Sequence, residues 1–321
     1  MPRILFVKTS SLGDVVHHCP AVTDVARRHP EAQIDWVVEA PFAEVAGLHP
    51  AVRRVIPVAI RRWRGALASP GTWREIAAFR RALRDARYDL VIDTQGLLKS
   101  AWICALAQGE RHGYDPASAR EPWAARFYDR VHPVPASLHA VERNRRLTGA
   151  SLGYVPEDPA DYGLRVPSGG IMPAARFALL LTMTSREDKL WPEEHWRSLG
   201  ARLESLGLDC VLPWGSEEER RRCGRIAAGL RRASVPPRMS LGELARLAGQ
   251  AACVVGVDTG LAHLAVAVGA PTLGLYCNSD PALTGLHGGG FQRNLGGIGR
   301  PPHPEDVAAA AAQALGAAHA A

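Results

Sequence analysis

The sequence predicts an α/β protein made of two doubly wound domains, each built on a parallel sheet. Both halves of the 321-residue chain open on a continuous apolar run, at 3–7 and at 177–181, and each run leads through a polar turn into a helical stretch. Unbroken apolar runs that feed helices are typical of strands buried in a parallel sheet. The length also suits two domains of about 150 residues each.

Further strands alternate with helical patterns of about 12 to 18 residues, as an α/β fold requires. In the first half, one helix is predicted from Asp14 to Arg28, and the further strands are predicted at 33–39, 54–58 and 89–93. In the second half, a helix starts at about Pro192, and the further strands are predicted at 209–213, 253–258 and 272–276.

A stretch rich in Pro, Gly and Ser marks the break between the halves. We therefore expect a first domain at 1–166, a linker at 167–173 and a second domain at 174–303. An irregular, glycine-heavy region runs from Gly285 to Pro304. A terminal helix over 305–315 follows, within a last segment at 304–321 that we expect to pack back on the first domain. The sheets are expected to face each other across a cleft, because such sheets bind ligands beyond the carboxyl ends of their strands.

Composition excludes several classes of protein. Hydrophobic residues make up 47% of the chain, too many for a disordered protein. The six cysteines form no C-x-x-C pair, which argues against a zinc ribbon or disulfide scaffold and fits a reducing cytoplasm. No apolar run approaches the roughly 18 residues of a membrane span, and the first run is too short for a signal peptide. No group of His, Asp or Glu has metal-ligand spacing, so we expect no metal.

Lysine is scarce and its placement is informative. Only Lys8, Lys99 and Lys189 are lysines among 38 basic residues. The side chain of Arg ends in a planar guanidinium group, whereas that of Lys ends in a compact ammonium that suits a single phosphate or carboxylate. Lys8 and Lys189 fall in the two strand-to-helix turns, and Lys99 follows another predicted strand. This placement favours ligand sites over chance positions on the surface.

The first strand-to-helix turn, at 8–14, carries hydroxyls, a glycine and an acid at a helix N-terminus, where free backbone N–H groups stabilise anions. Asp14 has two interpretations. It is a first-turn acid that caps the helix, or it is a general base aimed into the cleft. Position alone favours the capping role. Neither a P-loop nor a G-x-G-x-x-G fingerprint is present.

The second half offers two more candidate sites. Thr184, Ser185 and Lys189 precede a helix and make either a phosphate clamp or an ordinary polar loop. The D-T-G-L-A-H string at 258–263 turns from a strand into a helix whose N–H groups suit a diphosphate. His263 alone would be a core histidine, but its closeness to this turn favours a ligand role.

The R-R-W-R string at 61–64, with Trp73 and Arg74 downstream, interleaves arginine with tryptophan. This pattern suits an anionic, amphiphilic partner such as a phosphorylated lipid head group. Nucleic acid is a competing partner, and a solvated face in an Arg-rich protein is the plain alternative.

Several strings resemble the lipopolysaccharide heptosyltransferases of glycosyltransferase family 9. V-K-T-S-S-L-G-D at 7–14 resembles the opening of that family, and D-T-G-L-A-H at 258–263 resembles its donor-binding signature. The strings at 58–64, 188–196 and 212–215 are similar to those of the members that add the first heptose. The resemblance runs from residue 3 to about 280 and thins out over 285–299.

The resemblance implies a GT-B fold, two Rossmann-like domains with the active site between them, and an inverting, metal-independent glycosyl transfer without cofactor. The implied donor is ADP-L-glycero-β-D-manno-heptose, and the implied acceptor is the Kdo sugar of Kdo-lipid A at the cytoplasmic face of the inner membrane. The protein is then expected to act as a monomer and to bind no nucleic acid. A heptosyltransferase that acts later in the core is the nearest alternative, ahead of a non-catalytic nucleotide-sugar or nucleic-acid binder.

The same resemblance assigns roles to individual residues. Asp14 would be the general base, and Lys189 would stabilise the leaving ADP together with Thr184 and Ser185. The family has Thr-Thr at that pair, so Ser185 is a departure that keeps a hydroxyl. The donor would also meet Ser11, Glu219, Met239, Asp258, Thr259, Gly260 and His263. Glu217 and Glu218 are alternatives to Glu219 for the ribose. The acidic acceptor would meet Lys8, Arg61, Arg62, Arg64, Lys99 and Arg120.

Overall fold

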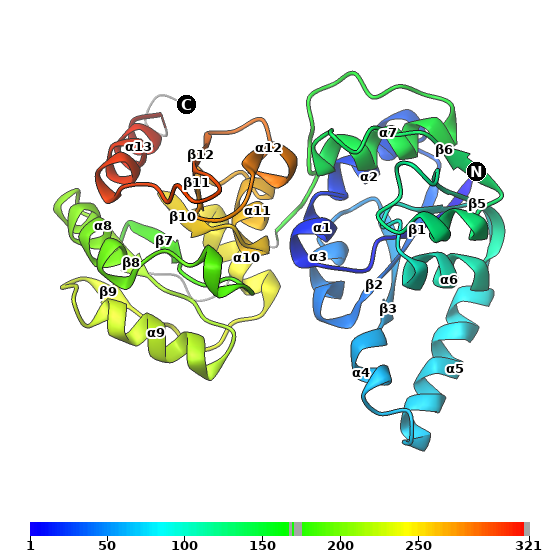
Figure 1. The fold of residues 1–321 in the computed structure, drawn as a ribbon, viewed down its shortest axis with the longest axis horizontal. Helices are drawn as coiled ribbons and strands as arrows, with labels where there is room; N and C mark the ends of the chain where they lie inside the picture. Colours follow the sequence, from blue (N-terminus) through cyan, green and yellow to red (C-terminus); the bar gives the residue numbers. More distant parts are fainter. Residues whose placement is uncertain (167–168, 170–174, 318–321) are drawn as a thin grey trace. The chain divides into compact units, whose positions relative to one another are not determined.

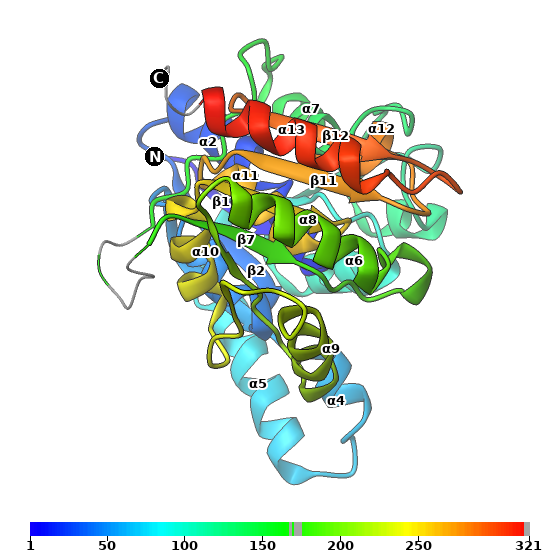
Figure 2. The same ribbon diagram turned by 90° about the vertical axis from the view of Figure 1, so that its left-hand side faces the viewer.

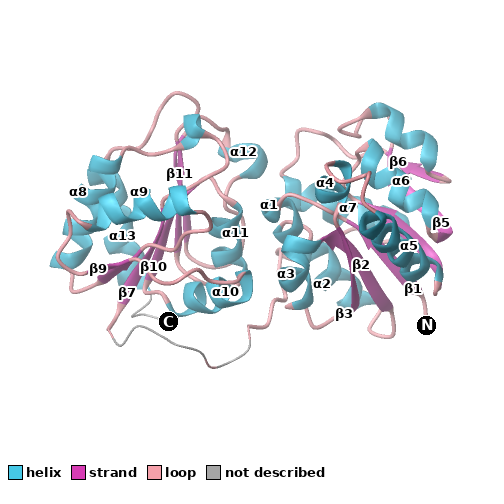
Figure 3. Ribbon diagram, turned by 90° about the horizontal axis from the view of Figure 1, so that it is seen from below, coloured by secondary structure: helices cyan, strands magenta, loops and turns pink. Residues whose placement is uncertain are grey.

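The computed structural model describes residues 1–166, 169 and 175–317, and the chain divides into two compact units, Met1–Leu164 and Arg165–Ala321 (Figure 1). Among these residues each unit forms one six-stranded sheet in which every pairing is parallel. Helices flank both faces of each sheet (Figure 3). The α/β, doubly wound fold class predicted from the two apolar runs is confirmed. Of the predicted linker, only residue 169 lies within the described residues.

The N-terminal sheet has the strand order β3-β2-β1-β4-β5-β6. Its strands are β1 (Arg3–Val7), β2 (Gln33–Glu39), β3 (Val52–Val58), β4 (Arg87–Asp93), β5 (Gln108–Tyr114) and β6 (Arg130–His132). β1 is central and almost wholly buried, and it pairs with β2 on one side and β4 on the other. Because the three strands are parallel, their carboxyl ends at Val7, Glu39 and Asp93 meet at one edge.

The helices of this unit are α1 (Leu12–Val16), α2 (Cys19–Arg28), η1 (Ala40–Phe42), α3 (Ala43–Gly47), α4 (Ile60–Arg64), α5 (Pro70–Arg84), α6 (Leu98–Leu106), η2 (Pro122–Phe127) and α7 (Ala140–Leu152). The single helix predicted over 14–28 was wrong, since α1 and α2 are separate. Pro20 lies in the first turn of α2. Proline has no N–H and would clash inside a continuous helix, but it is favourable at a helix start.

The C-terminal sheet has the order β12-β11-β10-β7-β8-β9. Its strands are β7 (Phe177–Leu181), β8 (Asp209–Val211), β9 (Ala233–Ser234), β10 (Cys253–Val257), β11 (Thr272–Tyr276) and β12 (Gln292–Gly296). Its helices are η3 (Glu187–Lys189), α8 (Glu193–Ser205), α9 (Glu217–Ala227), α10 (Leu241–Gln250), α11 (Gly260–Ala267), α12 (Pro281–Thr284) and α13 (Pro304–Ala317). The core centres on Trp191 and Trp196, both fully buried, whose rings meet edge to face at 5.1 Å.

The last helix, α13, lies across the second sheet beside α8 (Figure 2). Its buried side chains Val307, Ala311 and Ala314 belong to the core of the C-terminal unit. The small apolar face of α13 is therefore covered within its own unit.

Four strands escaped the sequence prediction: β5, β6, β9 and β12. The sequence of β5, Q-G-E-R-H-G-Y, is polar at its start, and β12 is an edge strand in the region predicted to be irregular. Edge strands carry polar side chains and so lack the apolar run that identifies central strands. No helix among the described residues is both long and apolar enough to cross a membrane.

Candidate functional site

The candidate residues form two clusters, each at the carboxyl ends of the strands of one sheet. In the N-terminal unit, α1 follows β1 after the turn at residues 8–11, and Asp14 lies at its third position. The carboxylate oxygen Oδ2 of Asp14 accepts a hydrogen bond from the backbone N–H of Ser11 at 2.9 Å. The capping role, one of the two interpretations of this residue, is therefore filled in the structure.

Capping leaves part of the Asp14 carboxylate available. The side chain is 25% exposed. The hydrogen bonds from the N–H and the hydroxyl of Ser11 both reach Oδ2, and Nη1 of Arg120 lies 3.9 Å from the same oxygen. A partly exposed carboxylate that hydrogen bonds hold in place is suited to act as a general base.

Lys8 is placed differently from the sequence expectation. Its side chain is buried, and Nζ donates to the carbonyl of Thr94 at 2.9 Å and to Oδ1 of Asn144 at 3.3 Å. Burial lowers the pKa of Lys8, while the charges of Asp14 and Asp93 oppose that shift. This amine therefore joins β1, β4 and α7 from inside, and the direct contact of Lys8 with an acceptor stays a prediction.

Lys99 lies at the same sheet edge and is half-buried. Its Nζ donates to Oγ of Ser10 at 2.9 Å, so it contacts the turn that carries Asp14. Burial lowers the pKa of Lys99, opposed first by the charge of Glu39. Burial also raises the pKa of Glu39, against the charges of Lys99 and Arg61. These groups form one mixed-charge cluster with Asp14.

Sequence reasoning missed two members of this edge, Glu39 and Gln95. Oε1 of Gln95 accepts the backbone N–H groups of Thr9 and Ser10 at 3.0 and 3.2 Å, which fixes the turn after β1. Both residues end or follow a predicted strand next to β1, and that position was the available signal.

The predicted acceptor arginines are not all equivalent. Arg62 makes two hydrogen bonds to Glu75, at 3.0 and 2.7 Å, so its guanidinium is already engaged. Arg61 lies within electrostatic reach of Glu39 and Lys99. Arg64 is exposed and forms no ion pair with any residue that the structure describes. The structure thus brings Arg61 and Arg120 to the Asp14 cluster and leaves Arg62 and Arg64 along α4.

In the C-terminal unit, two distant strings of the sequence meet. Nζ of Lys189, on η3, lies 2.6 Å from Oδ2 of Asp258, which directly follows β10. Oγ1 of Thr184 donates to the carbonyl of Asp258 at 2.8 Å. The two strings come together because β7 and β10 are neighbours in the sheet. Both charged side chains remain partly accessible, at 19% for Lys189 and 10% for Asp258.

The turn after Asp258 starts α11. Thr259 is the N-cap residue in an extended conformation, and Gly260 is the first helical residue. The unpaired N–H groups at such a helix start carry partial positive charge. His263 is buried on α11, with 4% exposed, so a direct ligand contact by this residue is not evident.

A cavity of about 620 Å³ opens beside this cluster. Thr184 and Ser185 line it from the segment after β7. On α9 its lining consists of Glu218, Glu219, Arg221, Arg222 and Arg225. Glu217 does not line the cavity and pairs with Arg220 in solvent. Met239, which precedes α10, does not line it either.

Arg222 was also missed by sequence reasoning. Its Nη2 donates to the carbonyl of Trp191 at 2.6 Å, and its Nη1 lies 3.2 Å from Oε1 of Glu193. It therefore ties the segment just after Lys189 to the helix that carries Glu219. Burial lowers the pKa of Arg222. Its position three residues after Glu219, on the same helix face, was the signal in the sequence.

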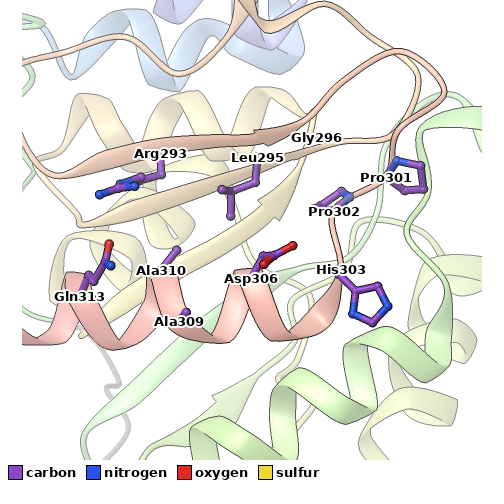
Figure 4. A pocket seen from close by; sticks show the side chains of 10 residues that line it. All are labelled: Arg293, Leu295, Gly296, Pro301, Pro302, His303, Asp306, Ala309, Ala310 and Gln313. Carbon is purple, nitrogen blue, oxygen red and sulfur yellow. The ribbon is translucent and has the colours of Figure 1, made fainter.

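A second cavity, of about 560 Å³, lies between β12 and α13, with His303 and Asp306 at one end and Arg293 and Gln313 at the other (Figure 4). None of the predicted site residues lines it. Across the ranges 1–166 and 175–317, no group of three or more His, Cys, Asp or Glu side chains is placed to hold a metal ion.

Comparison with known proteins decides the family. The sequence profile of glycosyltransferase family 9 (heptosyltransferase) matches residues 76–306. The chain belongs to this family. Lipopolysaccharide heptosyltransferase 1 of Pseudomonas aeruginosa is 51% identical over 293 residues, which are 89% of this chain and 81% of the relative. The enzyme of the same name from Escherichia coli K12 is 47% identical over 290 residues, 89% of this chain and 91% of the relative.

Solved structures support the same placement. The structure of E. coli heptosyltransferase WaaC with ADP superposes with a TM-score of 0.90 at 43% identity, covering 97% of this glycosyltransferase and 99% of that chain. E. coli ADP-heptose LPS heptosyltransferase II, at 21% identity and a TM-score of 0.80, shares the fold over 99% of each chain. The predicted GT-B fold, with two Rossmann-like units, is confirmed.

The ion pair between Lys189 and Asp258 yields a prediction about stability. Each single substitution, Lys189→Met or Asp258→Asn, leaves a half-buried charge without its partner. The double variant should therefore lose less free energy of unfolding than the two single variants lose together, with a coupling free energy of about 1–2 kcal/mol. Chemical unfolding followed by tryptophan fluorescence, to which the buried Trp191 and Trp196 contribute, measures it.

The control is the exposed pair of Arg220 and Glu217, whose side chains are 58% and 65% accessible. Its coupling should be about 0.5 kcal/mol or less, because solvent screens such pairs. Additive effects at Lys189 and Asp258 would mean that the two charges do not support each other.

Proposed function

We propose that this family 9 glycosyltransferase transfers L-glycero-D-manno-heptose from ADP-heptose to the Kdo residue of Kdo-lipid A, in the inner core of lipopolysaccharide. The observation that carries the proposal is the cluster of Lys189, Asp258 and Thr184 beside the cavity lined by Glu219. It is supported by the names of the relatives and by the solved relatives with ADP and with ADP-2-deoxy-2-fluoro heptose. We further propose that the protein acts as a monomer on the cytoplasmic face of the inner membrane.

The donor would bind at the carboxyl ends of β7, β8 and β10. The diphosphate meets the ammonium of Lys189, the hydroxyls of Thr184 and Ser185, and the N–H groups at the start of α11. The ribose reaches the carboxylate of Glu219 in the cavity. Ser11, Met239, Asp258, Thr259, Gly260 and His263 complete the proposed donor set, His263 by shaping α11 from within.

The proposed reaction is a single displacement at the anomeric carbon. The acceptor hydroxyl attacks that carbon, its proton passes to the Asp14 carboxylate, and the bond from the carbon to the β-phosphate oxygen breaks with ADP as the leaving group. Lys189 neutralises the charge that develops on that oxygen. In this proposal, Lys189 and backbone N–H groups take the part that a metal ion has in other transferases.

The acceptor is acidic, and the Asp14 cluster contains matching cations. Lys99, Arg61 and Arg120 lie at this edge of the N-terminal sheet, and they suit the carboxylate of Kdo and the phosphates of lipid A. Lys8 contributes indirectly, by holding the strand ends in place. Arg62 and Arg64 lie farther along α4, where a large acceptor can extend.

Incubating the purified protein with ADP-heptose, with and without Kdo-lipid A, tests the proposal directly. We expect ADP release that depends on Kdo-lipid A and gives a product one heptose heavier by mass spectrometry. Turnover only with an acceptor that already carries heptose would identify a later-acting core heptosyltransferase. ADP release that is independent of any acceptor would rule out the transfer.

Asp14→Asn separates the catalytic role of Asp14 from capping. The Asn amide oxygen can still accept the hydrogen bond from the N–H of Ser11, but it cannot take a proton at neutral pH. We expect kcat to fall by about 10²–10⁴ while the Kd for ADP changes by less than about twofold. An equal loss of ADP affinity, or an unchanged kcat, would leave Asp14 with the capping role alone.

A further inference from the structure

A helical arm of the N-terminal unit has no role in the donor site. Helices α4 and α5 with their connection, residues 60–84, form this α4–α5 arm. Both views show the arm extending well beyond the sheet that it grows from (Figures 1 and 2). The arm packs on β3 and α6 through part of α5, where Phe79 and Leu83 are buried. Trp63 of α4 is buried in the same core, 5.7 Å from the ring of Phe79. The exposed side chains of the arm lie outside this core.

The α4–α5 arm holds the whole positive excess of the chain. Its arginines are Arg61, Arg62, Arg64, Arg74, Arg80, Arg81 and Arg84. Glu75 is its only acid, so the arm has a formal charge equal to the +6 of the entire chain. The remaining sequence is therefore balanced in charge. A concentration of this kind attracts an anionic surface.

Contacts within the arm leave most of this charge unpaired. The carboxylate of Glu75 accepts two hydrogen bonds from Arg62 and one from Nε1 of Trp63, the last at 2.8 Å. The exposed arginines of the arm without an ion pair among the described residues are Arg61, Arg64, Arg74, Arg80, Arg81 and Arg84. The only acid of the arm is thus neutralised locally, and these guanidinium groups remain available for phosphates.

The tip of the arm is apolar. Leu67 is 52% exposed and Trp73 is 57% exposed. Nε1 of Trp73 donates to the carbonyl of Leu67 at 2.8 Å, so the polar group of the indole is already satisfied inside the tip. An indole of this kind gains no hydrogen bond by facing water, and its ring offers an apolar surface. Exposed Trp and Leu beside arginines are typical of segments that lie in a membrane interface.

We propose that the α4–α5 arm docks the protein on an anionic phospholipid bilayer, with Leu67 and Trp73 entering the interface and the exposed arginines binding lipid phosphates. The choice of an anionic bilayer as the partner rests on the proposed function, because the lipid-linked acceptor of that function lies in such a bilayer. Arg61, at the base of the arm, is within electrostatic reach of Glu39 and Lys99. Docking through the tip would therefore present lipid head groups to the cluster that contains Asp14.

Sedimentation of the full-length protein with vesicles tests the docking. Wild-type protein should bind vesicles of phosphatidylcholine and phosphatidylglycerol at least tenfold more tightly than vesicles of phosphatidylcholine alone. The double variant Leu67→Ser, Trp73→Ser should lose at least tenfold in partitioning to the anionic vesicles. Both side chains are exposed, and circular dichroism will confirm that the variant folds.

The matched control is Trp123→Ser. Trp123 is a comparably exposed tryptophan, 63% accessible, that lies on η2 outside the arm. The Trp123→Ser variant should bind anionic vesicles as tightly as the wild type does. Equal binding by the double variant and the wild type, equal loss in the control, or tight binding of duplex RNA with no vesicle binding would each overturn the proposal.

A second measurement separates docking from the proposed function. With a deacylated, water-soluble Kdo acceptor, the double variant should turn over at the wild-type rate, whereas with Kdo-lipid A in anionic vesicles its rate should fall at least tenfold. Equal rates of variant and wild type on the vesicle-bound acceptor would contradict docking through the arm. Vesicle binding by a wild type that transfers heptose to neither acceptor would reject the function and leave the docking in place.

Discussion

The ion pair between Lys189 and Asp258 is the contact on which the proposed donor site depends. Lys189 is on a short turn after β7, and Asp258 follows β10, 69 residues later in the sequence. Their 2.6 Å contact, with the hydroxyl of Thr184 on the Asp258 carbonyl, sets the cation beside the start of α11. Arg222 supports the same segment from α9 through the carbonyl of Trp191. A positive charge held in this way is preorganised for a departing diphosphate.

The three lysines of the chain share one structural property. Each amine makes a directed contact at the carboxyl end of a parallel strand: Lys8 with Thr94 and Asn144, Lys99 with Ser10, and Lys189 with Asp258. A guanidinium is planar and larger, and it would not fit the buried position of Lys8 in the same way. The chain is rich in arginine elsewhere, and its three lysines all lie at strand ends with such a directed contact.

The sequence was sufficient for the fold class, because central parallel strands such as β1, β7 and β11 are largely apolar runs. The bounds of these three strands and of β2 were predicted residue for residue. The sequence alone was insufficient for side chains whose role depends on a contact with a residue far away in the chain. Nothing local distinguishes Lys8, which is buried, from Lys99, which reaches the site edge. Arg62 was predicted to contact the acceptor, and nothing local indicates that Glu75, thirteen residues away, binds its guanidinium. Polar edge strands such as β12 were missed for the same reason, since pairing with β11 defines them.

A crystal structure of this protein with ADP bound tests the proposed donor site most directly. We expect an oxygen of the β-phosphate within hydrogen-bonding distance of Nζ of Lys189, and the diphosphate at the N–H groups that start α11. We also expect the ribose at the carboxylate of Glu219. A structure in which the diphosphate lies elsewhere, with the contact between Lys189 and Asp258 unchanged and no phosphate near either residue, would contradict it.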